Sequence, residues 1–260
     1  MSTKELQGKL WSVAPKYWSQ YFEPYFLPMY KRVLSRLTLN EDTLVLDAGC
    51  GSGLFSFMAI QKGAQVIGID AAPGLLEIAR NRNPGNSFLE EDLETLPFTN
   101  NTFDVVAGFN AFQYAGDIAK ALKEAKRVLK PLGKLIIGMW DRPERSEATE
   151  ILKAITTLLP LLPPGNNNPF ELSEDGKIEG ILGELQFSAV DKQYVGCPML
   201  FHSLSDAVKS FVGTAPAAAA SNYTNPEIVR ETITKAFSPF RLTEDLYHLQ
   251  NQFMLFIAEK

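Results

Sequence analysis

Two hydrophobic patterns alternate through the middle of the chain. Short runs of apolar and β-branched residues, typical of buried strands, occur near residues 44–47, 65–70, 86–89, 103–109 and 134–140. Between these runs the apolar residues recur at helical spacing, as in the segment 118–129. Alternation of this kind predicts an α/β fold in which helices cover a mostly parallel sheet.

The first strand runs into a turn that contains three alternating glycines. Gly49, Gly51 and Gly53 follow the strand directly, and an apolar helix begins at Leu54. Glycines permit positive φ angles and let the backbone approach a ligand closely. The free N–H groups at the start of the following helix then face whatever binds there. This strand, turn and helix form the first half of a nucleotide-binding unit.

An acid ends the second predicted strand. Asp70 follows Val66-Ile67-Gly68-Ile69, at the place where a carboxylate accepts hydrogen bonds from a ribose. The unit therefore predicts a ligand that contains adenosine.

The spacing of the glycines argues against a dinucleotide. The fingerprint G-x-G-x-x-G requires glycine at position 54 or 56, where this chain has Leu54 and Ser56. Asp47 stands two residues before the first glycine, where it would repel a phosphate and attract an ammonium group. A ribose at one end and an amino-acid ammonium at the other describe S-adenosylmethionine.

The segment Val45-Leu46-Asp47-Ala48-Gly49-Cys50-Gly51-Ser52-Gly53 resembles motif I of the class I S-adenosylmethionine-dependent methyltransferases. The resemblance implies a Rossmann-like three-layer sandwich whose seven-stranded, mostly parallel sheet has an antiparallel last strand. It also implies S-adenosyl-L-methionine as cofactor and S-adenosyl-L-homocysteine as product.

Two later segments resemble the same family. Asp92-Leu93 with Leu96-Pro97-Phe98 matches the segment in which an acid accepts a hydrogen bond from the adenine amino group. The phrase Arg127-Val128-Leu129-Lys130-Pro131-Leu132-Gly133-Lys134-Leu135 is similar to a signature of methyltransferase type 11, the branch that includes ubiquinone and menaquinone C-methyltransferases. Together the motifs cover roughly residues 40 to 141.

The resemblance implies a set of cofactor-binding residues at and after the carboxyl ends of the first four strands. They are Asp47, Ala48, Gly49, Cys50, Gly51, Asp70, Ala71, Leu75, Asp92, Leu93 and Asn110. Leu75 is expected against the adenine, although a core position explains this leucine equally well. The three acids Glu90, Glu91 and Asp92 form a charge run, a pattern common in solvated loops. For Asp92 the order of motifs favours function, and we expect Glu90 and Glu91 in solvent.

The composition of the chain limits the partners and the cellular compartment that we expect for the protein. The chain has 260 residues and a formal net charge of −5, which gives no general attraction to a phosphate backbone and makes nucleic acid a poor partner. We find no run long and apolar enough for a membrane span and no export signal, so we expect a cytoplasmic protein. The two cysteines, Cys50 and Cys197, fit a reducing compartment, and their number and spacing predict no metal site.

Segments on both sides of the motifs differ from the core. Residues 9–38 are rich in aromatics and interrupted by prolines at 15, 24 and 28. They resemble the helices that cover the cofactor in small-molecule methyltransferases, with Tyr17 and Trp18 as the residues to examine. We predict a lid at 1–40, a core at 41–197 and 244–260, and a cap insertion at 198–243.

The chemistry requires few side chains. A sulfonium methyl is a good electrophile, so alignment in a dry pocket supplies much of the catalysis. The sequence therefore names no catalytic residue, although His202, His248, Tyr114, Gln113 and Asp141 are candidates for proton transfer. We predict methyl transfer to a small, partly apolar molecule. The alternatives are a cofactor-binding protein of the same fold without methyl transfer, and a nucleotide-dependent oxidoreductase; the sequence leaves the acceptor and the oligomeric state open.

Overall fold

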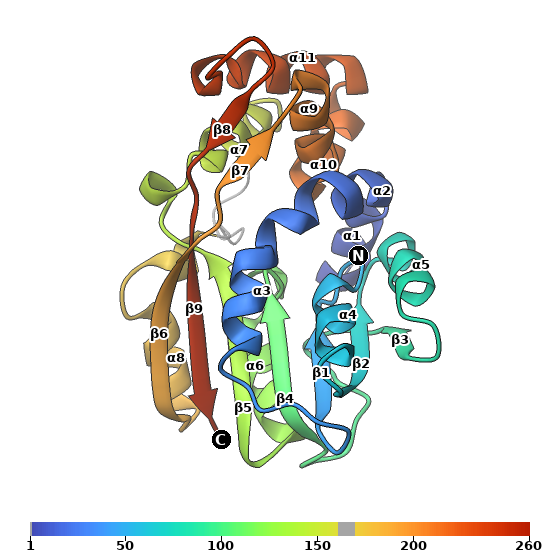
Figure 1. Cartoon of the computed structure of the whole chain (residues 1–260), viewed down its shortest axis with the longest axis vertical. Helices are drawn as coiled ribbons and strands as arrows, with labels where there is room; N and C mark the ends of the chain where they lie inside the picture. The colour runs from blue at the N-terminus through green and yellow to red at the C-terminus, as the bar shows by residue number, and fades with distance from the viewer. Residues whose placement is uncertain (1, 161–169) are drawn as a thin grey trace.

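A computed structural model describes residues 2–160 and 170–260 of the chain. Seven strands form one sheet in the order β3-β2-β1-β4-β5-β9-β6 (Figure 1). Its strands are β1 (Leu44–Ala48), β2 (Gln65–Asp70), β3 (Ser87–Glu90), β4 (Phe103–Phe109), β5 (Leu129–Trp140), β6 (Ser188–Gly196) and β9 (Gln252–Glu259). The pairs among β1 to β5 are parallel, and β9 is antiparallel to both of its neighbours. The predicted Rossmann-like sheet with an antiparallel last strand is confirmed.

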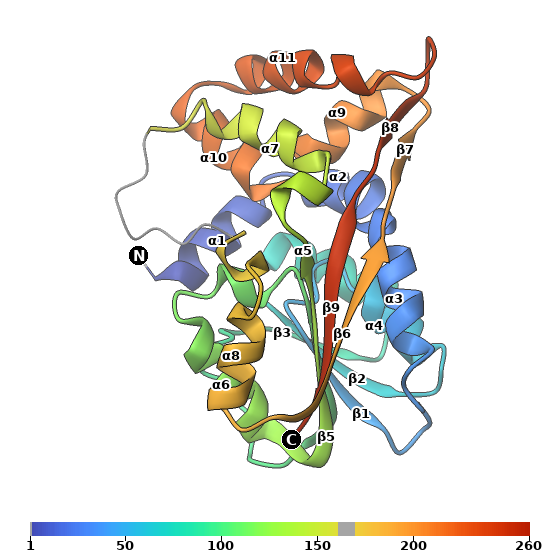
Figure 2. The same ribbon diagram turned by 90° about the vertical axis from the view of Figure 1, so that its left-hand side faces the viewer.

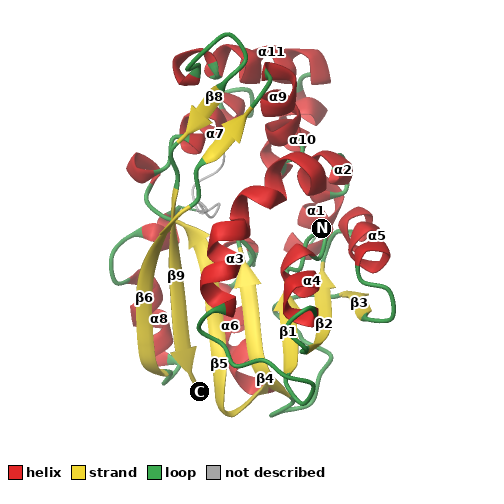
Figure 3. Ribbon diagram, viewed as in Figure 1, coloured by secondary structure: helices red, strands yellow, loops and turns green. Residues whose placement is uncertain are grey.

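Helices cover both faces of this sheet (Figure 3). On one face lie α3 (Leu27–Leu34), α4 (Leu54–Ile60) and α5 (Pro73–Arg82), and on the other α6 (Ile118–Val128) and α8 (Lys177–Glu184). Successive strand residues serve opposite faces, as strand geometry requires. Val45 packs in the cluster that contains α3 and α4, whereas Leu46 packs in the cluster that contains α6 and α8. Buried strands of this kind need apolar residues on both sides, which explains their nearly continuous apolar runs.

The amino-terminal segment is a series of short helical pieces. They are α1 (Thr3–Trp11), α2 (Pro15–Tyr17), a π-helix (Trp18–Phe22) and a 3-10 helix (Glu23–Phe26), followed by α3. As expected, the prolines divide the segment, because each stands in the first turn of the next piece, where its missing N–H costs nothing. π-helical turns are rare and often occur at functional sites.

A separate group of elements lies beyond the carboxyl ends of the parallel strands (Figures 1 and 2). It comprises α7 (Ala148–Thr156), β7 (Met199–Phe201), α9 (Leu204–Val212), α10 (Ala215–Tyr223), α11 (Pro226–Ala236) and β8 (Tyr247–Leu249), and we call it the cap. The alanine run of 215–220 is helical, and its alanines let α10 pack closely against α7, α1 and α11. The cap thus includes α7, which precedes the predicted insertion in the chain. The division into lid, core and cap insertion stays a prediction.

Two expected elements differ in the structure. Ser173 does not cap a helix of residues 173–185. Its hydroxyl donates to the carbonyl oxygen of Trp140 at 2.9 Å, and α8 begins after Gly176, which has a φ of 81°. The expected last strand, 246–258, is divided into β8 and β9 where the chain passes from the cap to the sheet. The turn-rich loop expected at 161–170 lies, except for Phe170, outside the described residues.

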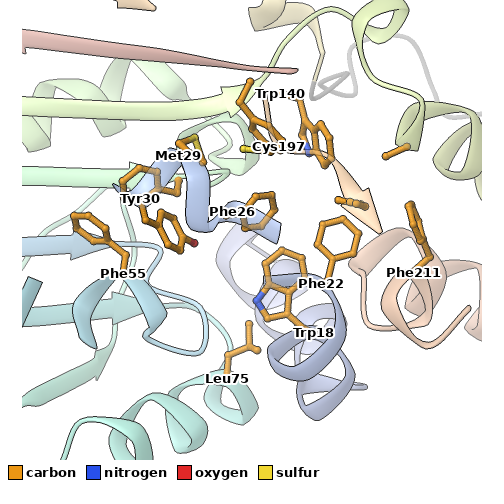
Figure 4. Packing of buried hydrophobic residues seen from close by; sticks show 14 of the residues in the cluster. Trp18, Phe22, Phe26, Met29, Tyr30, Phe55, Leu75, Trp140, Cys197 and Phe211 are labelled. Atoms are coloured by element: carbon orange, nitrogen blue, oxygen red, sulfur yellow. The ribbon is translucent and has the colours of Figure 1, made fainter. Parts of the chain in front are cut away.

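An aromatic cluster joins the cap to the sheet and to the amino-terminal segment (Figure 4). Phe22 stacks on Trp18 with ring centroids 4.9 Å apart, and its other ring contacts include Trp140 of β5 and Phe211 of α9. Phe26 contacts Trp140 as well. Large rings that interdigitate in this way bury extensive apolar area, and each pair adds about 0.5–1.5 kcal/mol beyond that area. The three parts of the molecule therefore share one core.

Asn251 fixes the point at which β8 becomes β9. It is 4% exposed; its Oδ1 accepts a hydrogen bond from the Ala148 N–H at 3.0 Å, and its Nδ2 donates to the Leu249 carbonyl at 3.3 Å. Substitution Asn251→Ala leaves a buried N–H at the start of α7 unpaired, so we expect a loss of about 2 kcal/mol in the free energy of unfolding. Urea denaturation measures it. The exposed neighbour Gln250, changed to alanine, serves as control, and equal effects of the two substitutions would contradict this role.

Candidate functional site

The carboxyl ends of β1, β2 and β4 open into a cleft that α1 covers. Its empty space, including the part that opens to solvent, is about 760 Å³. The residues that line the cleft are Thr3, Lys4, Gln7, Trp11, Trp18, Gly49, Gly51, Asp70, Ala71, Leu75, Glu91, Asp92, Leu93, Glu94, Phe109, Asn110, Ala111, Tyr114 and Ala115. In an open α/β sheet this edge is the usual place for a ligand.

The glycine turn forms the floor of the cleft. Gly49, Gly51 and Gly53 have φ angles of 77°, 54° and 76°, which side chains with a Cβ rarely adopt. Steric crowding also requires glycine at position 49, because a Cβ on Gly49 would lie 2.4 Å from the Cβ of Ala111. A Cβ on Gly51 would lie 3.4 Å from the indole nitrogen of Trp18. The turn is therefore shaped to bring bare backbone to the cleft.

Asp70 closes the turn against the second strand. Its carboxylate accepts hydrogen bonds from the backbone N–H groups of Gly51 and Ala72, each at 2.8 Å. Burial raises the pKa of Asp70, and the backbone hydrogen bonds oppose this effect. The side chain remains part of the cleft wall, so it can accept further hydrogen bonds from a ligand.

Most of the residues that the sequence predicted for cofactor binding meet in this cleft. Those that line it are Gly49, Gly51, Asp70, Ala71, Leu75, Asp92, Leu93 and Asn110. Glu91, expected in solvent, also belongs to the lining. Three further predicted residues, Asp47, Ala48 and Cys50, lie outside it. Whether any of these residues binds a cofactor stays a prediction.

The side chain of Asp47 turns into the protein. It is 1% exposed, and its Oδ2 accepts a hydrogen bond from the hydroxyl of Ser56 at 2.6 Å. Burial raises the pKa of Asp47 to about 7, against the lowering effect of that hydrogen bond. In this arrangement Asp47 ties the strand to α4. The sulfur of Cys50 likewise points away from the cleft, because Cys50 packs with Leu76 and Phe88.

Helix α1 supplies four cleft residues that the sequence analysis missed: Thr3, Lys4, Gln7 and Trp11. It sits directly on the second-strand loop, since a Cβ on Gly8 would lie 2.1 Å from the carbonyl oxygen of Ala71. A sequence signal for this helix exists. Ser2 and Glu5 form a reciprocal capping box at its start, and a serine followed three residues later by glutamate is the signature of such a box.

Two buried N–H donors of the cleft have no hydrogen-bond partner among the residues that the structure describes. They are Nε1 of Trp18 and Nδ2 of Asn110. Asn110 has a φ of 49°, and its Oδ1 accepts a hydrogen bond from Nε2 of Gln113 at 3.0 Å, which leaves the amide nitrogen free. Unpaired buried donors are costly, and a strained residue at a cleft often marks function. Both donors suit a ligand that carries hydrogen-bond acceptors.

A buried ion pair fastens the amino-terminal segment to the glycine turn. Nη1 of Arg82 lies 2.6 Å from Oε2 of Glu23, which is 2% exposed, and donates to the Ser52 carbonyl oxygen at 2.8 Å. The Ser52 hydroxyl donates to the same carboxylate oxygen, and Nη2 of Arg82 donates to the Ser19 hydroxyl at 2.9 Å. Burial raises the pKa of Glu23, while Arg82 counteracts the rise.

The candidates for proton transfer are scattered. Tyr114 lines the cleft, and burial raises the pKa of its phenol to about 12. Gln113 is buried behind Asn110, and Asp141 is buried beside Arg145. His202 and His248 belong to the β7–β8 region and are not cleft residues. Tyr17 is not part of the cleft wall either, whereas Trp18 is.

Among the residues that the structure describes, no group of histidine, cysteine or acidic side chains has the arrangement of a metal site.

No described helix has both the length and the apolar character that crossing a bilayer requires.

Residues 46–137 match the family described as "Methyltransferase domain". Over 108 residues the chain is 34% identical to malonyl-[acyl-carrier protein] O-methyltransferase of Serratia marcescens, and over 105 residues it is 40% identical to demethylmenaquinone methyltransferase of Chlorobaculum tepidum. The first match covers 42% of this chain and 42% of the Serratia marcescens protein. The second match covers 40% of this chain and 43% of the Chlorobaculum tepidum protein. The matched region thus spans less than half of each relative. Residues 46–137, about a third of the chain, are therefore similar to this methyltransferase-domain family.

Solved structures share the fold over a longer stretch. Phosphoethanolamine N-methyltransferase 2 of Haemonchus contortus, solved with S-adenosylhomocysteine, superposes with a TM-score of 0.57 at 19% identity, covering 90% of this chain and 53% of that one. The [4+2]-cyclase SpnF superposes with a TM-score of 0.58 at 18% identity, and the superposition covers 89% of this chain and 79% of SpnF. At this identity the likeness shows the fold.

The ion pair yields a first prediction for the site. Substitution Arg82→Met leaves the Glu23 carboxylate buried without its cation, so we expect a loss of about 3–5 kcal/mol in the free energy of unfolding. The double variant with Glu23→Gln should recover part of it. As control, Arg36→Met removes an exposed pair with Asp191 at 3.1 Å and should cost less than about 1 kcal/mol. Equal losses in urea denaturation for the two arginines would contradict a structural role of the buried pair.

The raised pKa of Asp47 yields a second prediction. Below about pH 4 the Asp47 carboxyl is protonated in both the folded and the unfolded protein. Between about pH 4 and 7 it ionises in the unfolded chain alone, so the free energy of unfolding falls as pH rises. Above about pH 7 the carboxyl is ionised in the folded protein too, and the full free-energy cost of burying its charge is present. We expect Asp47→Asn to raise the free energy of unfolding at pH 8 by about 2–3 kcal/mol more than at pH 5. Denaturation at both pH values measures the difference. Asp42→Asn, at an exposed position, serves as the control variant, and a pH-independent effect of Asp47→Asn would refute the prediction.

Proposed function

We propose that this protein transfers a methyl group from S-adenosyl-L-methionine to a small, partly apolar molecule bound beside the cleft. One observation carries the proposal: the glycine turn, Asp70 and the loop of Asp92 meet in one cleft within a methyltransferase domain. The relatives act, by their names, on malonyl-[acyl-carrier protein] and demethylmenaquinone. Neither substrate is assigned to this chain.

The residues of the cleft fit the cofactor. Asp70 would accept hydrogen bonds from the ribose, Asp92 and Leu93 would hold the adenine, and Leu75 would lie against its ring. The unpaired N–H groups of Trp18 and Asn110 are suited to the carboxylate of the methionine part. When bound, the cofactor supplies an electrophilic methyl group.

The charge of the cleft favours this ligand over a dinucleotide. Its ionisable lining comprises four carboxylic acids, Asp70, Glu91, Asp92 and Glu94, against one lysine, Lys4, in addition to the phenol of Tyr114. A pyrophosphate would meet repulsion there, whereas a ligand with an ammonium and a sulfonium group would meet attraction. The nucleotide-dependent oxidoreductase is therefore the weaker alternative.

The protein's own contribution to the chemistry is alignment and exclusion of water. Trp11 and Trp18 wall the cleft, and α1 covers it, so a bound acceptor would react in a dry site. With its pKa near 12, Tyr114 remains a neutral phenol at physiological pH and would donate a hydrogen bond rather than remove a proton.

A second candidate function is cofactor binding without methyl transfer. It is favoured by the solved [4+2]-cyclase SpnF, whose name denotes a different reaction on a similar fold. Because a fold does not dictate a reaction, transfer requires its own test.

The deciding experiment is calorimetric titration of the whole protein with S-adenosylhomocysteine and, separately, with NAD. We expect a dissociation constant of about 1–100 μM for the first and no binding of the second. Asp70→Asn should weaken binding at least about tenfold, because the new amide group is a poorer acceptor for two ribose hydroxyls. Exposed Asp42→Asn is the control.

Methyl transfer is then measured with labelled S-adenosylmethionine and a small-molecule extract. Label in an extracted product supports the enzyme, and tight binding with no transfer would favour the second candidate. Binding of NAD in place of S-adenosylhomocysteine would overturn the proposal.

A further inference from the structure

Three aromatic side chains in the cleft have the arrangement of an open box. Trp11 lies edge-to-face with Trp18, with centroids 4.8 Å apart and planes at 74°, and with Tyr114, with centroids 5.9 Å apart and planes at 76°. All three residues line the cleft. Trp11 is therefore one wall, and two rings that are nearly perpendicular to it border the same space.

Neighbouring residues hold two of these rings in place. Nε1 of Trp11 donates to Oε1 of Gln7 at 3.1 Å, one turn earlier on α1. Phe22 stacks on one face of Trp18 at 13° between planes (Figure 4), and Trp18 also contacts Trp11 and Phe26. Fixed rings lose little conformational freedom when a ligand binds.

The strand order places the box at one end of the cleft. The sheet runs β3-β2-β1-β4, so the loops that carry Asp92, Asp70, Gly49 and Asn110 follow one another along its edge. Tyr114 follows the last of these loops, and the Trp18 indole nitrogen lies beside Gly51. A cofactor with its adenine near Asp92 and its ribose at Asp70 would therefore extend its methionine part toward the box.

The electrostatics around the box suit a positive charge. The faces of indole and phenol rings attract cations, most strongly where water is excluded. The carboxyl group of Asp70 borders the glycine turn, and the nearby cation, Arg82, is paired with Glu23. The lysine of the lining, Lys4, is held at the other end by the carbonyl oxygen of Glu90, at 3.2 Å.

We propose that Trp11, Trp18 and Tyr114 form an aromatic box that recognises the positive sulfonium of the cofactor. The box would then bind charged S-adenosylmethionine in preference to neutral S-adenosylhomocysteine, which favours release of the product. This inference rests on the proposed function.

The test compares three ligands in calorimetric titrations of the full chain. S-adenosylmethionine carries a sulfonium, sinefungin carries a protonated amine near the same position, and S-adenosylhomocysteine carries a neutral thioether. In Trp11→Leu we expect affinity for both charged ligands to fall about tenfold relative to affinity for S-adenosylhomocysteine. Trp11→Phe, which keeps an aromatic face, should lie between wild type and Trp11→Leu.

Tyr17→Leu is the matched control, because Tyr17 belongs to the same segment and contacts Tyr21 and Arg230 rather than the cleft. It should leave the ratio of affinities unchanged. If Trp11→Leu lowers the affinity for all three ligands by one factor, or leaves all three affinities unchanged, the box does not distinguish a charged ligand from a neutral one. The inference is then wrong, while the proposed function stands. If the wild-type protein binds none of the three, the proposed function itself fails.

Discussion

The buried ion pair of Glu23 and Arg82 is the constraint on which the cleft depends. A carboxylate that is 2% exposed is tolerable because Arg82 and Ser52 satisfy it, and these partners come from α5 and from the glycine turn. The pair therefore fixes the amino-terminal segment over the turn at a single point, next to Trp18. Desolvation makes such pairs poor sources of net stability, but removing one partner is costly, which gives the arrangement its specificity.

The sequence predicted the elements whose signals are local. The strands from 44 to 140, the glycine turn and Asp70 at the end of β2 follow from apolar runs and from residues that tolerate special backbone angles. Eight of the predicted cofactor residues meet in the cleft, because parallel strands bring their carboxyl-terminal loops to one edge of the sheet. That convergence is a property of the topology, so the motif order alone was sufficient to predict it.

Other features depend on contacts between distant segments. Nothing near Asp47 in the chain shows that its carboxyl turns toward Ser56 instead of the cleft. The assignment of α7 to the cap rests on packing against α10 and α11, which lie more than fifty residues later. Helix α1 is a different case, because its capping box was visible in the sequence, whereas its position over Ala71 was not.

The shared aromatic core connects the cap to the cleft through direct ring contacts. Phe22 contacts Trp18, which lines the cleft, and Phe211 of α9 in the cap, with centroids 5.3 Å apart in the second pair. A Cβ on Gly213, at the end of α9, would lie 2.5 Å from the backbone nitrogen of Trp18, so the cap also contacts the π-helix directly. Close-packed interiors resist small displacements. The position of the Trp18 ring is therefore set jointly by the cap, by the stacking of Phe22 and by the ion pair one turn away at Glu23.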